Sequence, residues 1–241
     1  MPTLLISDLH LCPSRPLATR HFLDFLAGPA RGADALYILG DLFEYWPGDD
    51  ALGEAFNAGI CAALRALSDA SVALFFMAGN RDFLVGKTFA RAAGLTLLPD
   101  PATVELAGTR TLLMHGDTLC TEDHAYQAFR REVRSDDWLR AFLTLPLAAR
   151  KAQIEALREE SEEKKRGKSA EITDADPSAV LAAMRAAHCV RLIHGHTHRP
   201  AQHLMQDGAE MVERWVLPDW YKTGGYLACD AEGCKFLDWP A

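Results

Sequence analysis

The sequence predicts an α/β fold in which parallel strands are buried on both faces. Over residues 1–100, short apolar runs alternate with segments of helical periodicity. Several apolar runs stop at a side chain that can bind a metal ion, and a long helical segment interrupts the second half. With 241 residues, of which 49% are hydrophobic and 24% charged, the chain suits one domain that carries an insertion.

The first half of the chain is expected to form a βαβαβ unit. Short apolar runs predict strands at residues 3–7, 35–39 and 72–77. Helical periodicity fills the connections, at residues 16–26 and about 52–67. The alternation favours a parallel sheet with helices packed on it.

Each of these strands stops at a polar side chain. Asp8 follows the first strand, Asp41 the second and Asn80 the third. Open α/β sheets bind ligands beyond the carboxyl ends of their strands. We therefore expect these three side chains to meet at a functional site.

The second half begins with a hairpin and ends with further strands. Residues 103–106 and 111–115 flank Gly108, and residues 122–188 are helical in pattern. A short strand is expected at residues 191–194. Further strand-like runs follow at residues 201–205, 211–217, 226–230 and 235–237. This half therefore predicts a helical insertion, followed by antiparallel strands that complete a sheet.

Charge and cysteine usage restrict the partners and the compartment. The net charge of -8 argues against nucleic-acid binding through a basic face. The six cysteines form no C-x-x-C pair, and the opening run lacks a basic leader, so we expect reduced thiols without a disulfide framework. No apolar run approaches the roughly 20 residues of a membrane span, which leaves peripheral attachment as the expected membrane contact.

Five short motifs carry the candidate metal chemistry. In chain order they are D-x-H, G-D, G-N-R-D, H-G-D and G-H-x-H. Side chains at positions i and i+2 of a strand share a face, so the two ligands of D-x-H, or those of G-H-x-H, can bind one ion together. A carboxylate at a strand end, such as that of Asp41, can bridge two ions. The candidate ligands are Asp8, His10, Asp41, Asn80, His115, His196 and His198. Their mixture of carboxylate, amide and imidazole groups suits Mn²⁺, Fe²⁺ or Zn²⁺.

Taken singly, these motifs are weak evidence. A lone D-x-H is usually a surface accident, and His115 alone would more often be a core or loop histidine. Their fixed order, each piece just past a predicted strand, makes coincidence improbable. We therefore predict a site for two metal ions, which is typical of phosphate-ester chemistry.

The five motifs resemble those of the calcineurin-like metallophosphoesterase superfamily, and Gly40-Asp41-Leu42-Phe43-Glu44 matches its second motif in full. The resemblance covers almost the whole chain. It implies a four-layer αββα sandwich, and we place a helical lid insertion at about 122–188 in a single domain of residues 1–241. It also implies two divalent ions, one held by Asp8, His10, Asp41 and His198, and one held by Asp41, Asn80, His115 and His196.

Arg81 departs from the superfamily pattern, which has histidine at this position to help an alcohol leave. A guanidinium has a pKa above about 12 and is a poor proton donor, but it can bind phosphate oxygens and stabilise charge. A leaving group that is itself a phosphate, with a second pKa of about 6, needs no proton at neutral pH. We therefore predict a pyrophosphate bond as the target, with Arg81 and His196 as catalytic residues.

Longer strings narrow the resemblance. Residues 40–46, 79–83, 115–123, 126–130 and 193–200 look like those of UDP-2,3-diacylglucosamine pyrophosphohydrolases of lipid A synthesis. That family implies hydrolysis to UMP and 2,3-diacylglucosamine 1-phosphate by water attack at the α-phosphorus. It also implies Mn²⁺ dependence and a Gram-negative host, and we expect a cytoplasmic enzyme, peripheral on the inner membrane. The substrate-binding residues it indicates are Asn80, Arg81, Asp123, Ser161, Lys165, Lys168 and His196.

The helical insertion carries an apolar cluster near Pro146, and the simplest interpretation of this cluster is packing between helices. Trp138 and Phe142 lie four residues apart on one helix face, with Leu139 and Leu143 beside them. With Arg134, Arg140, Arg150 and Lys151 at its rim, the cluster could meet a membrane surface or line a groove for acyl chains. The family resemblance favours the groove. It leaves the role of Trp220-Tyr221 open.

Two other functions are compatible with the motifs. The same fold could act on soluble nucleotides or phosphodiesters, although the apolar insertion argues against this. It could also be a binding module that has lost catalysis, but such loss should leave gaps among the ligands and none is visible. We expect Asp82 and Glu44 to orient neighbouring residues.

Overall fold

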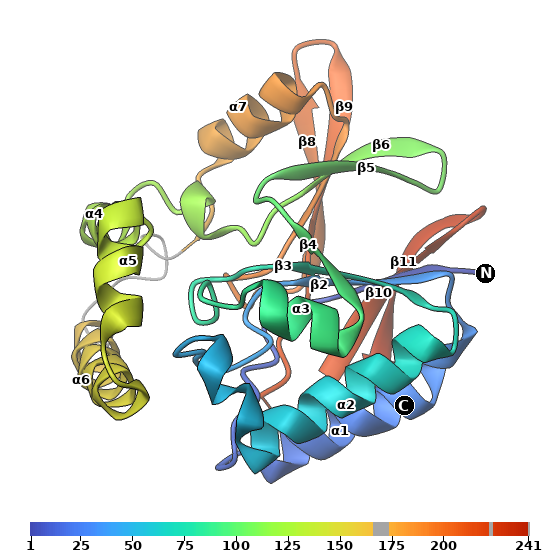
Figure 1. Cartoon of the computed structure of the whole chain (residues 1–241). Helices are drawn as coiled ribbons and strands as arrows, with labels where there is room; N and C mark the ends of the chain where they lie inside the picture. The colour runs from blue at the N-terminus through green and yellow to red at the C-terminus, as the bar shows by residue number, and fades with distance from the viewer. Residues whose placement is uncertain (166–173, 222–223, 241) are drawn as a thin grey trace.

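Two β-sheets form the centre of the molecule (Figure 1). The structure, a computed structural model, describes residues 1–165, 174–221 and 224–240, with the side chains of 159–165 not described. The first sheet has the strand order β11-β10-β1-β2-β3-β4. Its parallel strands are β1 (Thr3–Ile6), β2 (Ala35–Leu39), β3 (Ala73–Met77) and β4 (Leu95–Leu98). On the β1 side it continues with the antiparallel strands β10 (Gly224–Asp230) and β11 (Gly233–Trp239).

The second sheet has the strand order β5-β6-β7-β9-β8. Its strands are β5 (Ala102–Leu106), β6 (Thr109–Leu113), β7 (Arg191–His194), β8 (Ala201–Asp207) and β9 (Glu210–Val216). The central strands β6, β7 and β9 are parallel, and β5 and β8 close the edges in the antiparallel sense.

Three apolar clusters define four layers. The helices α1 (Pro16–Ala27), α2 (Ala55–Asp69) and α3 (Lys87–Ala93) cover the outer face of the first sheet through a core that includes Phe22 and Phe76. Leu39 and Ile193 meet between the two sheets. The helix α7 (Pro177–Ala187) covers the second sheet through Val180. The predicted αββα sandwich is therefore confirmed.

Two elements of the first half escaped the sequence analysis, namely α3 and β4. Both are short, and β4 buries Leu95 but leaves Thr96 exposed, so neither a helical period nor a continuous apolar run marks them. Together they add a fourth parallel strand to the predicted βαβαβ unit. The last two strands also join the first sheet, next to β1, which sequence order alone does not indicate.

The cysteines follow the expectation with one exception. Cys12, Cys61, Cys120 and Cys189 are free and buried. Cys229 and Cys234, however, face each other across β10 and β11 and form a disulfide, which the prediction of reduced thiols did not include. The pairing arises because a tight turn brings the two strands into register at these positions.

The remaining helices form a group beside the sheets (Figure 1). They are α4 (His124–Val133), capped by Asp123, α5 (Asp136–Thr144), capped by Ser135, and α6 (Leu147–Lys165). Since α7 packs on the second sheet, α4, α5 and α6 are the helices that stand apart; the division into a domain and a lid insertion stays a prediction. Among the described residues, no helix has the length and apolar character needed to cross a membrane.

Candidate metal centre

The carboxyl ends of strands from both sheets meet at one edge of the sandwich. Asp8 and His10 follow β1, Asp41 follows β2 and Asn80 follows β3. From the second sheet, His115 follows β6, and the segment after β7 supplies His196 and His198. The structure thus brings together all of the predicted ligands, although they span nearly 190 residues of sequence.

The backbone around these side chains adopts a conformation that most residues avoid. The φ angles are 56° at Asp8, 50° at His10, 53° at Asp41, 67° at His196 and 53° at His198. Non-glycine residues with positive φ cost roughly 1 kcal/mol or more and concentrate at functional sites. The neighbouring glycines are needed for close approach, because a Cβ at Gly79 would collide with Asp41 and one at Gly195 would collide with Asp8.

One group of ligand atoms is formed by Asp8, His10 and His198. Their donor atoms lie within 4.8 Å of one another. His198 Nε2 lies 3.4 Å from His10 Nε2 and 3.3 Å from Asp8 Oδ1, and Asp8 Oδ1 is buried without a hydrogen-bond partner. A buried oxygen and two imidazole nitrogens that converge in this way fit a bound cation.

A second group surrounds Asn80. His115 Nδ1 donates to the carbonyl of Leu39 at 2.9 Å, which in the neutral ring leaves Nε2 with a lone pair. This Nε2 lies 3.0 Å from Asn80 Oδ1, and His196 Nδ1 lies 3.0 Å from the same oxygen. In that tautomer His115 Nε2 and Asn80 Oδ1 are two acceptors that face each other, an arrangement that a cation between them would satisfy.

Asp41 lies between the two groups. Its Oδ2 is 3.8 Å from His10 Nε2, and its Oδ1 is 3.7 Å from His115 Nε2. One carboxylate can therefore reach ions on both sides, and the mixture of carboxylate, amide and imidazole atoms fits divalent transition metals.

The ionisation of the histidines shows how negative this site is. Burial opposes the charged form of His115, but the carboxylates of Asp41 and Asp8 outweigh it and raise its pKa to about 9. Burial and the neighbouring His115 lower the pKa of His196 to about 4. The carboxylates around His115 thus favour positive charge at this position.

Asp82 holds the ligand loops in place, as expected from the sequence. It is fully buried and accepts backbone N–H groups from Leu42 at 2.7 Å and from Gly79 at 2.8 Å, with Asp41 and Phe43 at longer range. The loops after β2 and β3 are thereby tied to each other. Glu44 likewise faces His10, with Oε2 3.4 Å from Nδ1, and accepts from Arg158 of α6 at 3.0 Å.

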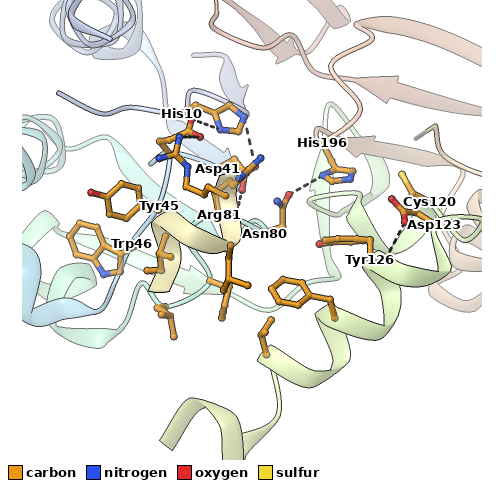
Figure 2. Close-up of a pocket in the computed structure, with 18 of the residues that line it drawn as sticks. His10, Asp41, Tyr45, Trp46, Asn80, Arg81, Cys120, Asp123, Tyr126 and His196 are labelled. Carbon is orange, nitrogen blue, oxygen red and sulfur yellow. Dashed lines mark hydrogen bonds and ion pairs between the residues drawn. The ribbon is translucent and has the colours of Figure 1, made fainter. Parts of the chain in front are cut away.

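A cavity of about 570 Å³ opens from these ligands (Figure 2). One end is polar and includes His10, Asp41, Asn80 and His196. The other end is apolar and is walled by side chains of the helical group. These apolar lining residues are Ala125, Tyr126, Phe129, Val133, Trp138, Phe142, Ile154 and Leu157. The arrangement suits a ligand with a charged end and a long apolar end.

The predicted substrate residues fall into two sets. Arg81 and Asp123 line the cavity together with Asn80 and His196, and Figure 2 shows them around its polar end. Ser161 and Lys165 lie in the last part of α6, residues 159–165, where only the backbone is described. Lys168 lies outside the described residues.

The apolar cluster of the insertion has a definite orientation. The rings of Trp138 and Phe142 stack with centroids 4.5 Å apart, and both line the cavity. Arg150 was expected at the rim but is buried, donating to the carbonyls of Pro47 and Leu145 and pairing with Asp50. It was misplaced because sequence spacing cannot show which cation packs inward.

Three aromatic residues near the ligands had no role assigned from the sequence, namely Tyr221, Trp220 and Tyr126. The Tyr221 ring stacks on His10 with centroids 5.1 Å apart and carries the Arg15 guanidinium 4.5 Å from its own centroid. Trp220 is buried among Phe22 and Phe25. Tyr126 lines the cavity and lies near His196, with ring centroids 6.0 Å apart. Only the recurrence of Tyr126, Phe129 and Val133 at helical spacing could have indicated this wall of α4.

Comparison with known proteins agrees with this geometry. The family model described as calcineurin-like phosphoesterase matches residues 1–200. A UDP-2,3-diacylglucosamine hydrolase of Xanthomonas oryzae pv. oryzae is 52% identical over 240 residues, covering 97% of each chain. A UDP-2,3-diacylglucosamine hydrolase of Aromatoleum aromaticum is 51% identical over 233 residues, covering 97% of this chain and 95% of its own.

Proposed function

Because the chain belongs to the calcineurin-like phosphoesterase family, we propose that it hydrolyses the pyrophosphate bond of UDP-2,3-diacylglucosamine. The products are UMP and 2,3-diacylglucosamine 1-phosphate, and the reaction is a step of lipid A synthesis. The relatives at about 50% identity bear the name of this hydrolase over nearly the full length of the chain.

One observation carries the proposal, namely that the ligand groups and an apolar chamber share a single cavity. A soluble nucleotide would need only the polar end. Acyl chains would need the apolar walls that α4, α5 and α6 provide. The shape of the cavity therefore favours a phosphorylated lipid over the soluble nucleotides and phosphodiesters considered above.

The donor set supports two divalent ions, which we propose to be Mn²⁺. Asp8, His10, Asp41 and His198 would hold one, and Asp41, Asn80, His115 and His196 would hold the other. When bound, the ions supply positive charge for the phosphoryl oxygens and a water molecule of lowered pKa. Oxygen and nitrogen donors without thiolate are consistent with manganese.

The protein residues have distinct tasks in the reaction. Arg81, Asn80 and His196 bind the phosphoryl oxygens and stabilise the charge that develops during attack at the α-phosphorus. The leaving lipid phosphate requires no proton at neutral pH, so a guanidinium can take the place of a proton donor. Asp123 binds the substrate beside them, with Ser161, Lys165 and Lys168 as further contacts.

The same cavity suggests how the enzyme meets its substrate. The lipid must come from a membrane, and Phe129, Leu143 and Leu157 of the helical group are large apolar side chains that are exposed. We propose peripheral attachment to the cytoplasmic face of the inner membrane through this region.

The test is hydrolysis of UDP-2,3-diacylglucosamine by metal-stripped protein, with and without Mn²⁺, in ¹⁸O-labelled water. We expect manganese-dependent release of UMP that carries the label. Label on the lipid product would instead locate the attack at the other phosphorus. Turnover of simple phosphodiesters without turnover of the lipid would contradict the substrate while leaving the metal centre intact.

A further inference from the structure

Asp117 lies close to the metal centre but has no ligand or substrate role in the scheme above. It follows His115 by two residues, at the start of the short turn Asp117–Leu119, and is completely buried. A buried carboxylate is costly unless charged or polar groups surround it. Its partners therefore indicate what it does.

Those partners come from α4. The Tyr126 hydroxyl donates to Asp117 Oδ2 at 2.5 Å, and Arg130 Nε donates to the same oxygen at 2.7 Å. Gln127 Nε2 donates to the backbone carbonyl of Asp117 at 2.7 Å. One turn further along the helix, Arg134 donates to the carbonyl of Gly79 at 2.8 Å, directly before the ligand Asn80.

The spacing of these residues makes the contacts a docking surface. Tyr126, Arg130 and Arg134 recur at intervals of four and so share one face of the helix. Val133 is the buried residue of α4, so apolar packing contributes little to holding the helix against the sheets. The polar contacts to Asp117 and Gly79 must fix its position.

The position of α4 matters because Tyr126 forms part of the cavity wall. Its ring lies near His196, with centroids 6.0 Å apart, while its hydroxyl is committed to Asp117. From this geometry we infer that Asp117 is a positioning residue, which docks α4 on the ligand loops and so sets the apolar wall that Tyr126, Phe129 and Val133 give to the cavity. The choice of substrate in the test below rests on the proposed function, whereas the docking of α4 by Asp117 does not.

The test compares Asp117→Asn, Tyr126→Phe and the double variant, with Glu132→Gln as a control for charge loss on an exposed part of α4. Loss of a buried charged hydrogen bond should lower kcat/KM on UDP-2,3-diacylglucosamine by about tenfold, mostly through KM. Turnover of bis(4-nitrophenyl) phosphate and Mn²⁺ binding by calorimetry should change little. The double variant should lose no more than the larger single loss, because both remove one interaction.

Amide hydrogen exchange of the whole protein supplies a readout that does not depend on activity. Asp117→Asn should speed exchange in α4 by about tenfold relative to Glu132→Gln, without a matching change in α1 or α2. If Asp117→Asn fails to fold, Tyr126→Phe must show the same selective loss on the lipid, and its absence overturns the inference.

Equal loss on both substrates together with weaker Mn²⁺ binding would also overturn it, because Asp117 would then act through His115. Failure of the unaltered protein to turn over the lipid would reject the proposed function. The exchange measurement would still decide the docking role.

Discussion

Arg81 is the side chain on which the predicted bond preference depends. Its backbone N–H donates to Asp41 Oδ1 at 2.8 Å, so its main chain is fixed to the proposed bridging ligand while its side chain lines the cavity. A guanidinium stabilises negative charge without giving up a proton. Such a residue should favour leaving groups that depart as anions.

Replacement of Arg81 tests this preference directly. Arg81→Ala should lower kcat on the lipid pyrophosphate by about a hundredfold or more, the usual cost of one charge-stabilising donor. Arg81→His should not restore activity on the lipid pyrophosphate. It should, however, raise the rate on phosphodiesters with alcohol leaving groups relative to the rate on the pyrophosphate. Rates across a series of leaving groups of known pKa measure the effect. A rise of pyrophosphate activity in Arg81→His would refute the leaving-group argument.

His194 is the last residue of β7, directly before the G-H-x-H motif, and it contributes to stability rather than to the ligand groups. It is fully buried, its Nδ1 donates to the Gly195 carbonyl at 2.8 Å, and its Nε2 accepts from Arg214 at 2.9 Å. Burial first, and then the charge of Arg214, lower its pKa to about 3. Unfolding releases the ring to a pKa of about 6.5, so the unfolded chain binds the proton first as the pH falls.

His194 should therefore make the protein less stable in acid. Its contribution is complete above pH 6.5 and is lost at about 1.4 kcal/mol per pH unit as the pH falls toward the folded pKa. We expect the unfolding free energy of metal-free protein, measured in urea, to fall less between pH 6 and pH 4.5 in His194→Gln. Parallel curves for the two proteins would show that this ring does not titrate on unfolding.

The helices α5 and α6 shape the cavity through the contacts that hold them in place, rather than through the helix propensity of their residues. Arg150, Lys151 and Arg158 of α6 pair with Asp50, Glu54 and Glu44, all in the connection between β2 and α2. These ion pairs hold α6 against that connection. They leave Trp138 and Phe142 of α5 facing the interior of the cavity.

The apolar wall of α5 should act on the lipid half of the substrate alone. Trp138→Ser with Phe142→Ser should lower kcat/KM for UDP-2,3-diacylglucosamine by about a hundredfold, because each ring contributes about 1–3 kcal/mol of burial. Activity on UDP-glucosamine, which lacks the chains, should change little. Ala141→Ser is the matched control, since this residue of α5 is exposed and does not line the cavity. Equal loss on both substrates, with a lower Tm, would indicate misfolding instead.

The metal centre spans the whole sandwich, because β1, β2 and β3 of one sheet and β6 and β7 of the other end at it. Asp8 and Asp41 bring their carboxyl groups together at this edge, both on backbone with positive φ. Bound cations would offset the repulsion between two carboxylates and link the sheets. A ligand that binds the folded state but not the unfolded state raises the free energy of unfolding by mass action.

Removal of metal should therefore lower the Tm of the protein. Mn²⁺ at about a hundredfold over its Kd adds about 2.7 kcal/mol per site, or roughly 5–10 °C for a chain of this size. Thermal unfolding in chelator and in Mn²⁺ measures the shift. Asp41→Asn should remove most of it, because this carboxylate faces both ligand groups. An unchanged Tm on adding metal would contradict the proposed site.

Much of the fold could be predicted from local patterns. Apolar runs marked β2 and β7 at their observed bounds, because strands buried on both faces leave an uninterrupted signal. Such a signal was absent from α3 and β4, which are short and partly exposed. The disulfide of Cys229 with Cys234 depends on strand register, and no residue spacing reveals it.

The sequence by itself determined the fold class, the family and the set of candidate metal ligands, since each depends on residue type and order along the chain. The tertiary structure alone decided that Arg150 packs inward, that Tyr221 stacks on His10, and that Asp117 holds α4 against the ligand loops. The reason is physical. Period and composition are local properties, whereas these contacts join segments whose distance and orientation are set by how the two sheets and the helical group pack together.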